Sequence, residues 1–398
     1  MNADMKPRRQ DDAQGLPPWP HVAIVVLNWN RCEDTLECLG SLQRLRYPSY
    51  QIIVVDNGST DGSVERITAW AKNNFVNGPR VLTYSHSSTS PPCRPCSEGE
   101  AEVGRIPTRA SRDTRSCFAS TLTIIRLGEN LGFAAGNNVG IRYILGLGCD
   151  YAFILNNDTV VQQDALTEMV RSVAGNPDIG MVAPAVYDYS RKDIVDRMGL
   201  ALTRAGLAYE RRSGKDGVLF CPSGCAALYS RSLLLAVECG GQFFDEDFFA
   251  YYEDIDLGFR AHRKGFKAVL ADGAVIYHKG GAASGGRGSS LSIYLGHRNA
   301  ILSVVKNYPA RMLVTESLWI ILGHILGLLG NVGRPEFRSA AKGKWHGLVG
   351  AAGAWQKRRT AYIRAHNHTV LPIDTRRFPF RRGPRRRLGG ALQEGPPA

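Results

Sequence analysis

The stretch "QIIVVDNGSTDGS" at residues 51–63 decides the fold, because an apolar, β-branched run passes directly into a turn of Gly, Ser and Asp. Such a run predicts a buried strand, which the turn ends. A similar strand, "VAIVVLNWN", comes before it at residues 22–30, and a helical pattern follows each of the two strands. Strands that alternate with helices predict an α/β fold with a mostly parallel central sheet.

The alternation continues along the chain. Further buried strands are predicted at "LTIIRL" (122–127), "YAFIL" (151–155) and "IGMVAPAV" (179–186). The stretch "KAVLADGAVIYH" (267–278) predicts one or two strands that end at His278. A helical region then begins at "SLSIYLGHRNAILSVVKNY" and runs to about residue 365.

Composition and charge divide the 398 residues into four parts. Much of the net charge of +13 lies in the stretch "RRFPFRRGPRRR" (376–387). Such a basic run indicates an anionic partner, a nucleic acid or the acidic face of a membrane, or else a solvated disordered tail, and of these partners we expect the membrane and no nucleic acid. The expected parts are a disordered N-terminal tail (1–20), an α/β domain (21–285), a helical, membrane-associated region (286–365) and a basic disordered tail (366–398).

A low-complexity insert at 85–120 interrupts the α/β domain, rich in Ser, Pro, Arg and Cys and without periodicity. A zinc site in the insert is chemically conceivable, although a single C-x-x-C is a weak signal. Its four candidate ligands are His86, Cys93, Cys96 and Cys117. The nine cysteines have no regular spacing, and the N-terminus has no signal peptide. Both features predict a cytoplasmic protein with reduced thiols.

The stretch "MLVTESLWIILGHILGLLG" (312–330) is about long enough to cross a bilayer. Glu316 and His324 within it are expensive at membrane depth. We therefore rank an amphipathic helix in the membrane interface first, a buried helix of the domain second and a spanning helix third.

Polar clusters follow three of the predicted strands. They are "LNWN" with Asn28 and Asn30, Asp56, and "NNDT" with Asn157 and Asp158. Asn30, three residues before Glu33, also matches a helix N-cap pattern. Because ligands bind at the carboxyl ends of parallel strands, these clusters predict a nucleotide-sized pocket.

Two further stretches carry candidate chemistry. "NLGFAAGNNVG" (130–140) is Gly-rich and opens a helix, which suits a phosphate, although it is neither a Walker A loop nor G-x-G-x-x-G. In "FFAYYEDIDLGFRAHRKGF" (248–266), Glu253, Asp254 and Asp256 crowd together after aromatic residues. We expect the crowding to raise the pKa values of these carboxyl groups, which favours a general base. The start of a helix, where acidic residues are favourable, explains the three acids equally well.

Taken in order, eight motifs resemble a family 2 inverting glycosyltransferase with the GT-A fold, most closely the bacterial rhamnosyltransferase-like branch. The resemblance covers about residues 21–365 without the insert. The motifs are "VVLNWN", "VVDNGSTDGS", "NLGFAAGNNVG", "ILNNDT", "SGCAALYSR", "FFAYYEDIDLGFR", "YHKGG" and "YLGHRN".

The resemblance implies a role for each matching residue. Asp254 would be the catalytic base, and Asp158 and His278 would hold Mg²⁺ or Mn²⁺, with Asn156 in the place of the first Asp of the D-x-D motif. The donor nucleotide, ribose and diphosphate would be bound by Leu27, Asn28, Asn30, Asp56, Asn130, Gly132, Asn137, Asn157 and Arg298.

The implied reaction is the transfer of one sugar from a nucleotide-diphospho-sugar, such as a dTDP-rhamnose-like donor, to a hydroxyl of a glycan or lipid-linked glycan. A Q-x-x-R-W motif, typical of processive members, is missing from the sequence. The reaction would take place at the inner face of the cell membrane. The alternatives are a sugar nucleotidyltransferase, which would need a basic Gly-rich loop after the first strand, and a non-catalytic peripheral-membrane binder on a degenerate fold.

Overall fold

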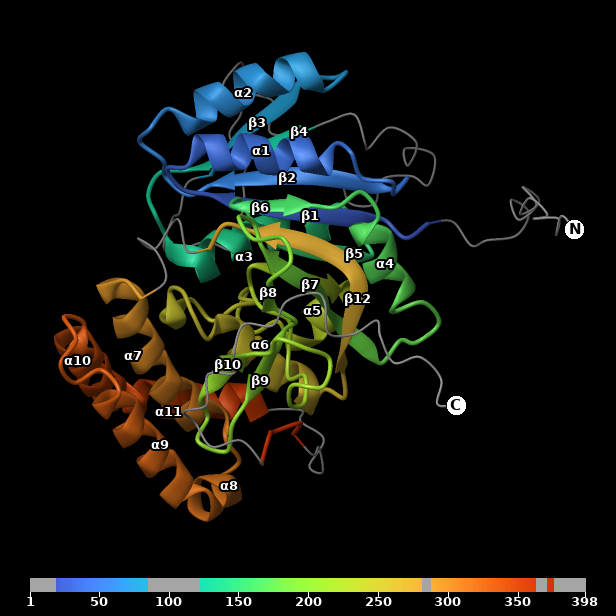
Figure 1. Cartoon of the computed structure of the whole chain (residues 1–398). Coiled ribbons are helices and arrows are strands. Elements are labelled where there is room, and N and C mark those ends of the chain that lie inside the picture. The colour runs from blue at the N-terminus through green and yellow to red at the C-terminus, as the bar shows by residue number, and fades with distance from the viewer. Residues whose placement is uncertain (1–18, 85–121, 281–287, 363–370, 376–398) are drawn as a thin grey trace, which may run out of the picture.

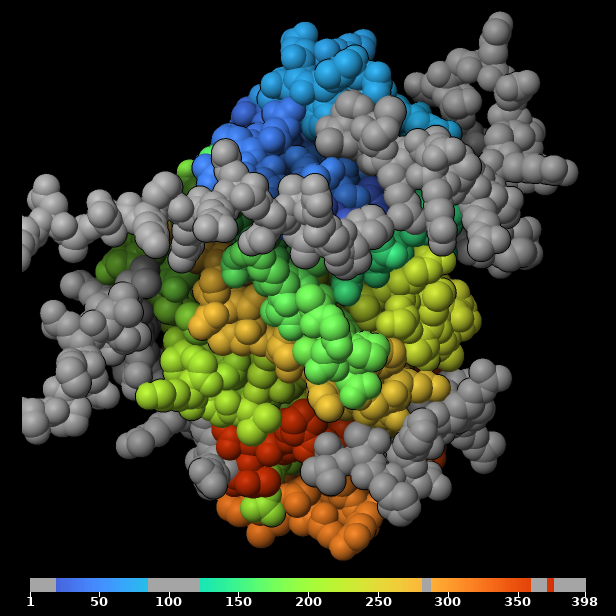
Figure 2. Space-filling view, turned by 90° about the vertical axis from the view of Figure 1, so that its right-hand side faces the viewer, coloured from blue at the N-terminus to red at the C-terminus, as the bar shows by residue number. Residues whose placement is uncertain are grey.

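The structure is a computed structural model, and it describes residues 19–84, 122–280, 288–362 and 371–375 (Figure 1). The insert at 85–120, with its four candidate zinc ligands, lies outside the described residues, as do most of the two terminal tails. Figure 2 shows the first two helices (blue) at the upper end of the molecule and the C-terminal helices (orange to red) at the lower end.

A mixed sheet of ten strands forms the centre, in the order β3-β4-β2-β1-β5-β11-β7-β12-β6, with β8 paired to β7. Strands β3, β4, β2, β1 and β5 are parallel, whereas β11 inserts antiparallel between β5 and β7. A separate two-stranded sheet pairs β9 with β10. The strands are β1 (Val22–Asn28), β2 (Tyr50–Asp56), β3 (Pro79–Tyr84), β4 (Leu122–Leu127), β5 (Tyr151–Asn156), β6 (Thr159–Val161), β7 (Ile179–Asp188), β8 (Val195–Arg197), β9 (Leu200–Leu202), β10 (Ala208–Glu210), β11 (Ala226–Ser230) and β12 (Lys267–His278).

Helices cover both faces of this sheet. Helices α1, α2 and α4 pack on one face, and α3, α5 and α6 on the other (Figure 1). The α/β fold and the mostly parallel sheet are therefore as the sequence predicts. The helices are α1 (Cys32–Leu42), α2 (Ser63–Asn74), α3 (Gly132–Gly146), α4 (Ala165–Arg171), α5 (Arg231–Val237), the 3₁₀ turn η2 (Glu246–Phe248), α6 (Glu253–Arg263), α7 (Ser290–Asn307), α8 (Ala310–Thr315), α9 (Ser317–Leu329), α10 (Phe337–Val349) and α11 (Ala351–Tyr362).

Strand β1 shows why its sequence is apolar throughout. Side chains alternate between the two faces of a sheet. Ile24 and Val26 accordingly pack in the core under α1 and α2, while Ala23 and Val25 pack under α3. A strand covered on both faces needs an apolar residue at every position.

The stretch 312–330 forms two helices, α8 and α9, separated at Glu316. The Glu316 carboxylate accepts a hydrogen bond from Arg204 Nε at 2.6 Å, which explains an acid within this apolar run. In α9 only Gly323 is fully buried, so α9 is not a core helix. No helix in the described part of the chain has both the length and the apolar character to cross a membrane.

Lys344 of α10 lies between α7 and α9, where burial lowers its pKa to about 7. The titratable groups that face it are His324 of α9, which contacts its ammonium, and His297 of α7. Burial and the nearby Lys344 lower the pKa of His297 to about 4 and that of His324 to about 3, so both imidazoles are neutral at pH 6. Lys344 thus carries a charge that these neighbours do not compensate.

Replacing this lysine is therefore expected to stabilise the protein. The folded pKa lies below the unfolded one, so the cost of the charge is greatest below about pH 7 and fades as the pH rises toward about 10.5. Lys344→Met should raise the free energy of unfolding by ~2 kcal/mol at pH 6, and by less at pH 9. Thermal unfolding at both pH values measures this gain, with the exposed Lys342→Met on the same helix as the control. Equal melting temperatures of the two variants at pH 6 would show that the charge costs nothing.

Candidate active site

Three predicted polar clusters meet at one edge of the sheet. Asn28 at the end of β1 pairs in register with Asp56 at the end of β2, and Leu27 pairs with Asn156 at the end of β5. On the other side, β12 pairs with β6, which brings His278 opposite Thr159. The pairing of these strands therefore collects residues that lie up to 250 positions apart in the sequence, from Asn28 to His278.

Asp158 and His278 form a buried pair. Asp158 Oδ1 lies 3.3 Å from His278 Nε2, and the two side chains are 5% and 4% exposed. The other ring nitrogen, Nδ1, lies 3.1 Å from Asp196 Oδ2. Burial opposes the imidazolium charge, but hydrogen bonds to Asp158 and Asp196 outweigh it and raise the pKa of His278.

The pair fits a hard divalent cation. Two cis ligands at the 2.0–2.1 Å distance of Mg²⁺ are about 3 Å apart, close to the observed separation. A proton on Nδ1, donated to Asp196, leaves the Nε2 lone pair for the metal. In the described part of the chain no group of three or more His, Cys, Asp or Glu side chains is arranged to hold a metal, so the remaining ligands would be diphosphate oxygens and water.

The polar side chains at the ends of β1, β2 and β5 are connected by hydrogen bonds. Asp56 accepts from Asn28 Nδ2 at 2.7 Å and from the Ser59 amide at 3.1 Å. Asn28 Oδ1 accepts from Thr35 Oγ1 at 2.6 Å, and Asn157 Nδ2 donates to the same threonine at 2.9 Å. Asn28 and Asp56 are almost completely buried, so they fix the positions of β1 and β2 relative to the turn at Ser59.

The N-cap role expected for Asn30 is wrong. Helix α1 begins at Cys32 after Arg31, and no side chain caps it. Asn30 instead has a positive φ of 46°, and its Oδ1 accepts from the Thr60 amide at 2.7 Å. Asn30 thereby ties the loop after β1 to the loop after β2, which a local N-cap pattern could not reveal.

The Gly-rich loop packs against another loop. Gly132 has a φ of +84°, and a Cβ there would lie 2.5 Å from the Phe249 ring, so only glycine fits. The Ala134 amide donates to the Phe249 carbonyl at 3.0 Å, which occupies part of the α3 N-terminus expected to face a phosphate. Asn130 accepts from Asn57 at 2.9 Å.

Asn137, one of the expected donor contacts, is fully buried within α3. Its Nδ2 donates to the Phe133 carbonyl one turn earlier at 2.9 Å, and its expected contact with the donor stays a prediction.

The three crowded carboxylates differ in environment. Burial raises the pKa of Asp254, although its two oxygens accept from the Gly224 and Ile255 amides at 3.0 and 2.8 Å. Burial and the neighbouring Asp254 hold the pKa of Glu253 well above its usual range. Asp256 has the opposite shift: burial opposes its charge, but Lys306 and Arg260 outweigh it and lower its pKa. The expectation that crowding raises the pKa values is thus wrong for Asp256, which serves as a structural ion-pair partner.

Helix α7 holds the turn that precedes these carboxylates. This turn has left-handed backbone at three non-glycine residues: Phe249, Tyr251 and Tyr252. The Nδ2 of the buried Asn299 lies within 2.7–2.9 Å of three backbone carbonyls, those of Phe248, Ala250 and Tyr251. Arg298 also donates to carbonyls of this turn, those of Asp247 and Phe248. The expected contact of Arg298 with the diphosphate stays a prediction beside these bonds to the turn.

A chain of contacts connects Asp254 with the Asp158–His278 pair. Ser223, next to Gly224, accepts from Arg197 Nη1 at 3.0 Å, and Arg197 Nε donates to Asp196 at 3.2 Å. Asp196 in turn contacts His278. Sequence reading missed Asp196 and Arg197; the only signal was an adjacent acid and base in the short segment "VDRMG".

Two family models match the sequence. "Glycosyl transferase family 2" matches residues 23–89, and "Glycosyl transferase family group 2" matches residues 151–283. The two segments contain β1, β2, β5, the Asp158–His278 pair and Asp254.

Characterised relatives are distant. The chain is 22% identical over 223 residues to the low-salt glycan biosynthesis hexosyltransferase Agl10 of Haloferax volcanii, covering 52% of this chain and 67% of the relative. It is 21% identical over 248 residues to a poly-beta-1,6-N-acetyl-D-glucosamine synthase of Staphylococcus aureus, covering 62% of this chain and 47% of the relative. The chain thus spans about two thirds of the hexosyltransferase and about half of the synthase.

A solved structure has a similar fold. The crystal structure of GalNAc-T7 with UDP, GalNAc and Mn²⁺ aligns with a TM-score of 0.50 and 10% identity, covering 87% of this chain and 58% of that one. At this identity the similarity concerns the fold alone. The fold is of the GT-A type, and both matched segments are similar to models of glycosyl transferase family 2, which identifies the protein as a glycosyltransferase.

Proposed function

We propose that the protein transfers one sugar from a nucleotide-diphospho-sugar to a hydroxyl of a glycan or lipid-linked glycan, with inversion at the anomeric carbon. The observation that supports this most is the buried Asp158–His278 pair, linked through Asp196, Arg197 and the Ser223–Gly224 segment to Asp254. A dTDP-rhamnose-like donor is the first to test, because the motif order resembles the rhamnosyltransferase-like branch.

Asp254 is the proposed general base. The acceptor hydroxyl would pass its proton to this carboxylate while its oxygen attacks the anomeric carbon from the side opposite the diphosphate. The bond between that carbon and the diphosphate oxygen then breaks. Burial raises the pKa of Asp254, which makes it a stronger base than an exposed aspartate.

The donor is proposed to lie at the strand ends. Leu27 and Asn28 would contact the base through their backbone, and Asp56 the ribose, as the family resemblance implies. The hydrogen bonds of Asn30, Asn57 and Asn130 hold the loops beside this proposed donor site in place. Asp158 and His278 would hold Mg²⁺ or Mn²⁺, which supplies positive charge where the departing diphosphate gains negative charge.

The C-terminal helices support a proposal for the acceptor and for the place of reaction. We propose that these helices contact the inner face of the cell membrane and that the acceptor is carried there on a lipid. The exposed apolar side chains of α9 support a peripheral contact of this kind.

A thermal-shift panel of UDP-, GDP- and dTDP-sugars, each with and without Mg²⁺ or Mn²⁺, tests the proposal. At least one donor should raise the melting temperature, and more so with metal, because a ligand at 100 times its Kd stabilises the folded state by about 2.7 kcal/mol. No shift with any donor would favour a non-catalytic binder. Release of pyrophosphate from a nucleoside triphosphate would favour a nucleotidyltransferase.

A further inference from the structure

The C-terminal helices expose an apolar stripe. Six residues at helical spacing along α8, α9 and the following turn are each at least half exposed: Val314, Leu318, Ile321, Ile325, Leu329 and Val332. Helix α10 adds Trp345, Leu348 and Val349, which are between 61% and 65% exposed. Exposed apolar side chains in this number mark an interaction site.

The charge of the C-terminal helices indicates which kind of partner binds the apolar stripe. Residues 290–362 contain ten Lys or Arg and only two Asp or Glu. Arg311, Arg334, Arg338 and Lys342 are exposed. A second copy docked on this face would bring like charges together, whereas an anionic lipid would neutralise them.

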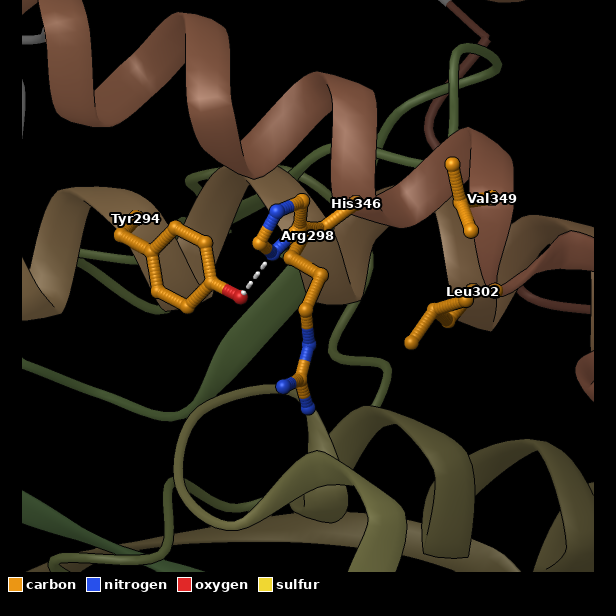
Figure 3. A pocket seen from close by; sticks show the side chains of 6 residues that line it. Tyr294, Arg298, Leu302, His346 and Val349 are labelled. Atoms are coloured by element: carbon orange, nitrogen blue, oxygen red, sulfur yellow. Dashed lines mark hydrogen bonds between the residues drawn. The ribbon is translucent and has the colours of Figure 1, made fainter.

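A cleft of about 380 Å³ lies between α7 and α10, beside this stripe (Figure 3). It is lined by Tyr294, Arg298, Leu302, His346, Val349 and Gly350. Figure 3 shows Leu302 and Val349 on one side of the cleft, and Tyr294 bonded to His346 on the other, with O to Nδ1 at 2.8 Å. Because Val349 is 64% exposed, the apolar wall of the cleft continues into the surface of α10.

Arg298 gives this cleft a cation. Its Nε donates to Asn299 Oδ1 at 2.8 Å, and its Nη2 donates to the carbonyls of Asp247 and Phe248. Within the described residues, Nη1 meets no acceptor, and no carboxylate lies within ion-pair distance of the guanidinium; the Asp247 carboxylate pairs with Lys357. Two N–H donors and a full charge thus remain for a ligand.

The same arginine connects the cleft with the proposed base. It binds the turn at Phe248, which lies six residues before Asp254. A ligand that is anchored at Arg298 would therefore lie beside the turn that leads into α6, the helix that carries Asp254.

We propose that the α7–α10 cleft binds the phosphate of a lipid-linked acceptor, with Arg298 on the phosphate and with Leu302 and Val349 on the first part of the hydrocarbon chain. The inference rests on the proposed function, since it names the acceptor of that reaction. A guanidinium with two free donors suits a phosphate oxygen, and the adjoining apolar wall suits a hydrocarbon chain attached to that phosphate.

Equilibrium binding of four probes to the full chain in detergent tests the proposal: a C20 polyprenyl phosphate, the matching C20 polyprenol, inorganic phosphate and phosphatidylglycerol vesicles. The polyprenyl phosphate should bind at least ~10-fold more tightly than the alcohol or the inorganic ion. Arg298→Gln and Val349→Asp should each weaken its binding ~10-fold or more, because one removes the cation and the other adds a repelling charge. The change at Val349 lies on an exposed residue and leaves the turn untouched. Val76→Asp, at a 93% exposed site in another part of the fold, is the matched control.

Each contrary result has its own meaning. Equal affinity for the phosphate and the alcohol, or unchanged binding by both variants, would overturn the cleft assignment. Vesicle binding that falls as steeply as polyprenyl phosphate binding in both variants would assign the cleft to bulk phospholipid instead. Because nucleotide-sugar melting shifts are measured on the same samples, donor binding without polyprenyl phosphate binding refutes this inference alone, and the absence of any donor shift refutes the proposed function.

Discussion

Asp254→Asn is expected to lower the rate of sugar transfer by ~10³-fold or more and to leave donor affinity within ~3-fold of the wild type. The amide keeps the shape of the side chain and an oxygen for the Gly224 amide, but it cannot accept the acceptor proton. Single-turnover transfer at saturating donor, together with donor binding by calorimetry, separates the two effects.

Glu253→Gln is the matched control for this variant. Burial and Asp254 hold the pKa of Glu253 well above its usual range, and glutamine keeps the shape of this side chain but cannot accept a proton. Its transfer rate should stay within ~3-fold of the wild type. If Asp254→Asn transfers sugar at a near-normal rate, or if Glu253→Gln alone abolishes transfer, the base is assigned to the wrong residue.

The pH profile of transfer gives an independent measurement. Because burial raises the pKa of Asp254, the ionised base should be lost at a higher pH than for an exposed aspartate. The acid limb of kcat/KM is therefore expected above the ordinary range of about pH 4. An acid limb at or below that pH would argue against a buried base.

Asp158→Ala is expected to abolish the effect of metal on donor binding. In Mn²⁺ or Mg²⁺ its donor affinity should fall by about 10–100-fold, while without metal it should equal that of the wild type. The reason is geometric: with two protein ligands available, the loss of one leaves His278 alone. Calorimetric titration of the donor with and without metal measures this directly and needs no turnover.

His278→Ala should reproduce the loss, because the same ion needs both side chains. The exposed Asp164→Ala, whose carboxylate contacts Arg46 at 3.6 Å, is the control for removing a negative charge and should leave the metal dependence unchanged. If donor affinity in metal is unaffected in Asp158→Ala, the pair does not hold the cation.

The sequence predicted the strands and the residues at their ends, because an apolar run followed by a polar turn is a local pattern. It could not predict β11, which enters the sheet antiparallel between β5 and β7, because strand order depends on long-range pairing. Asp196, Arg197 and Asn299 were missed for a similar reason: each acts on residues distant in the sequence, such as His278 at 82 positions from Asp196. The prediction that Asn30 caps α1 was wrong because Asn30 Oδ1 accepts a hydrogen bond from the Thr60 amide, which lies in another loop.

The strained turn before Asp254 has a consequence for how the chain can be divided. Its carbonyls are held by Asn299, and Lys306 of the same helix lies 2.6 Å from Asp245 and 2.7 Å from Asp256. A chain cut at residue 285 would keep Asp56, Asp158 and His278, yet the three left-handed residues of the turn would lose the contacts with Asn299 that hold them. Such a fragment should bind nucleotide-sugars and fail to transfer them. The helices after residue 285 therefore belong to the catalytic unit. A natural or engineered exchange of these helices would change the support of the turn before Asp254 together with the proposed acceptor surface.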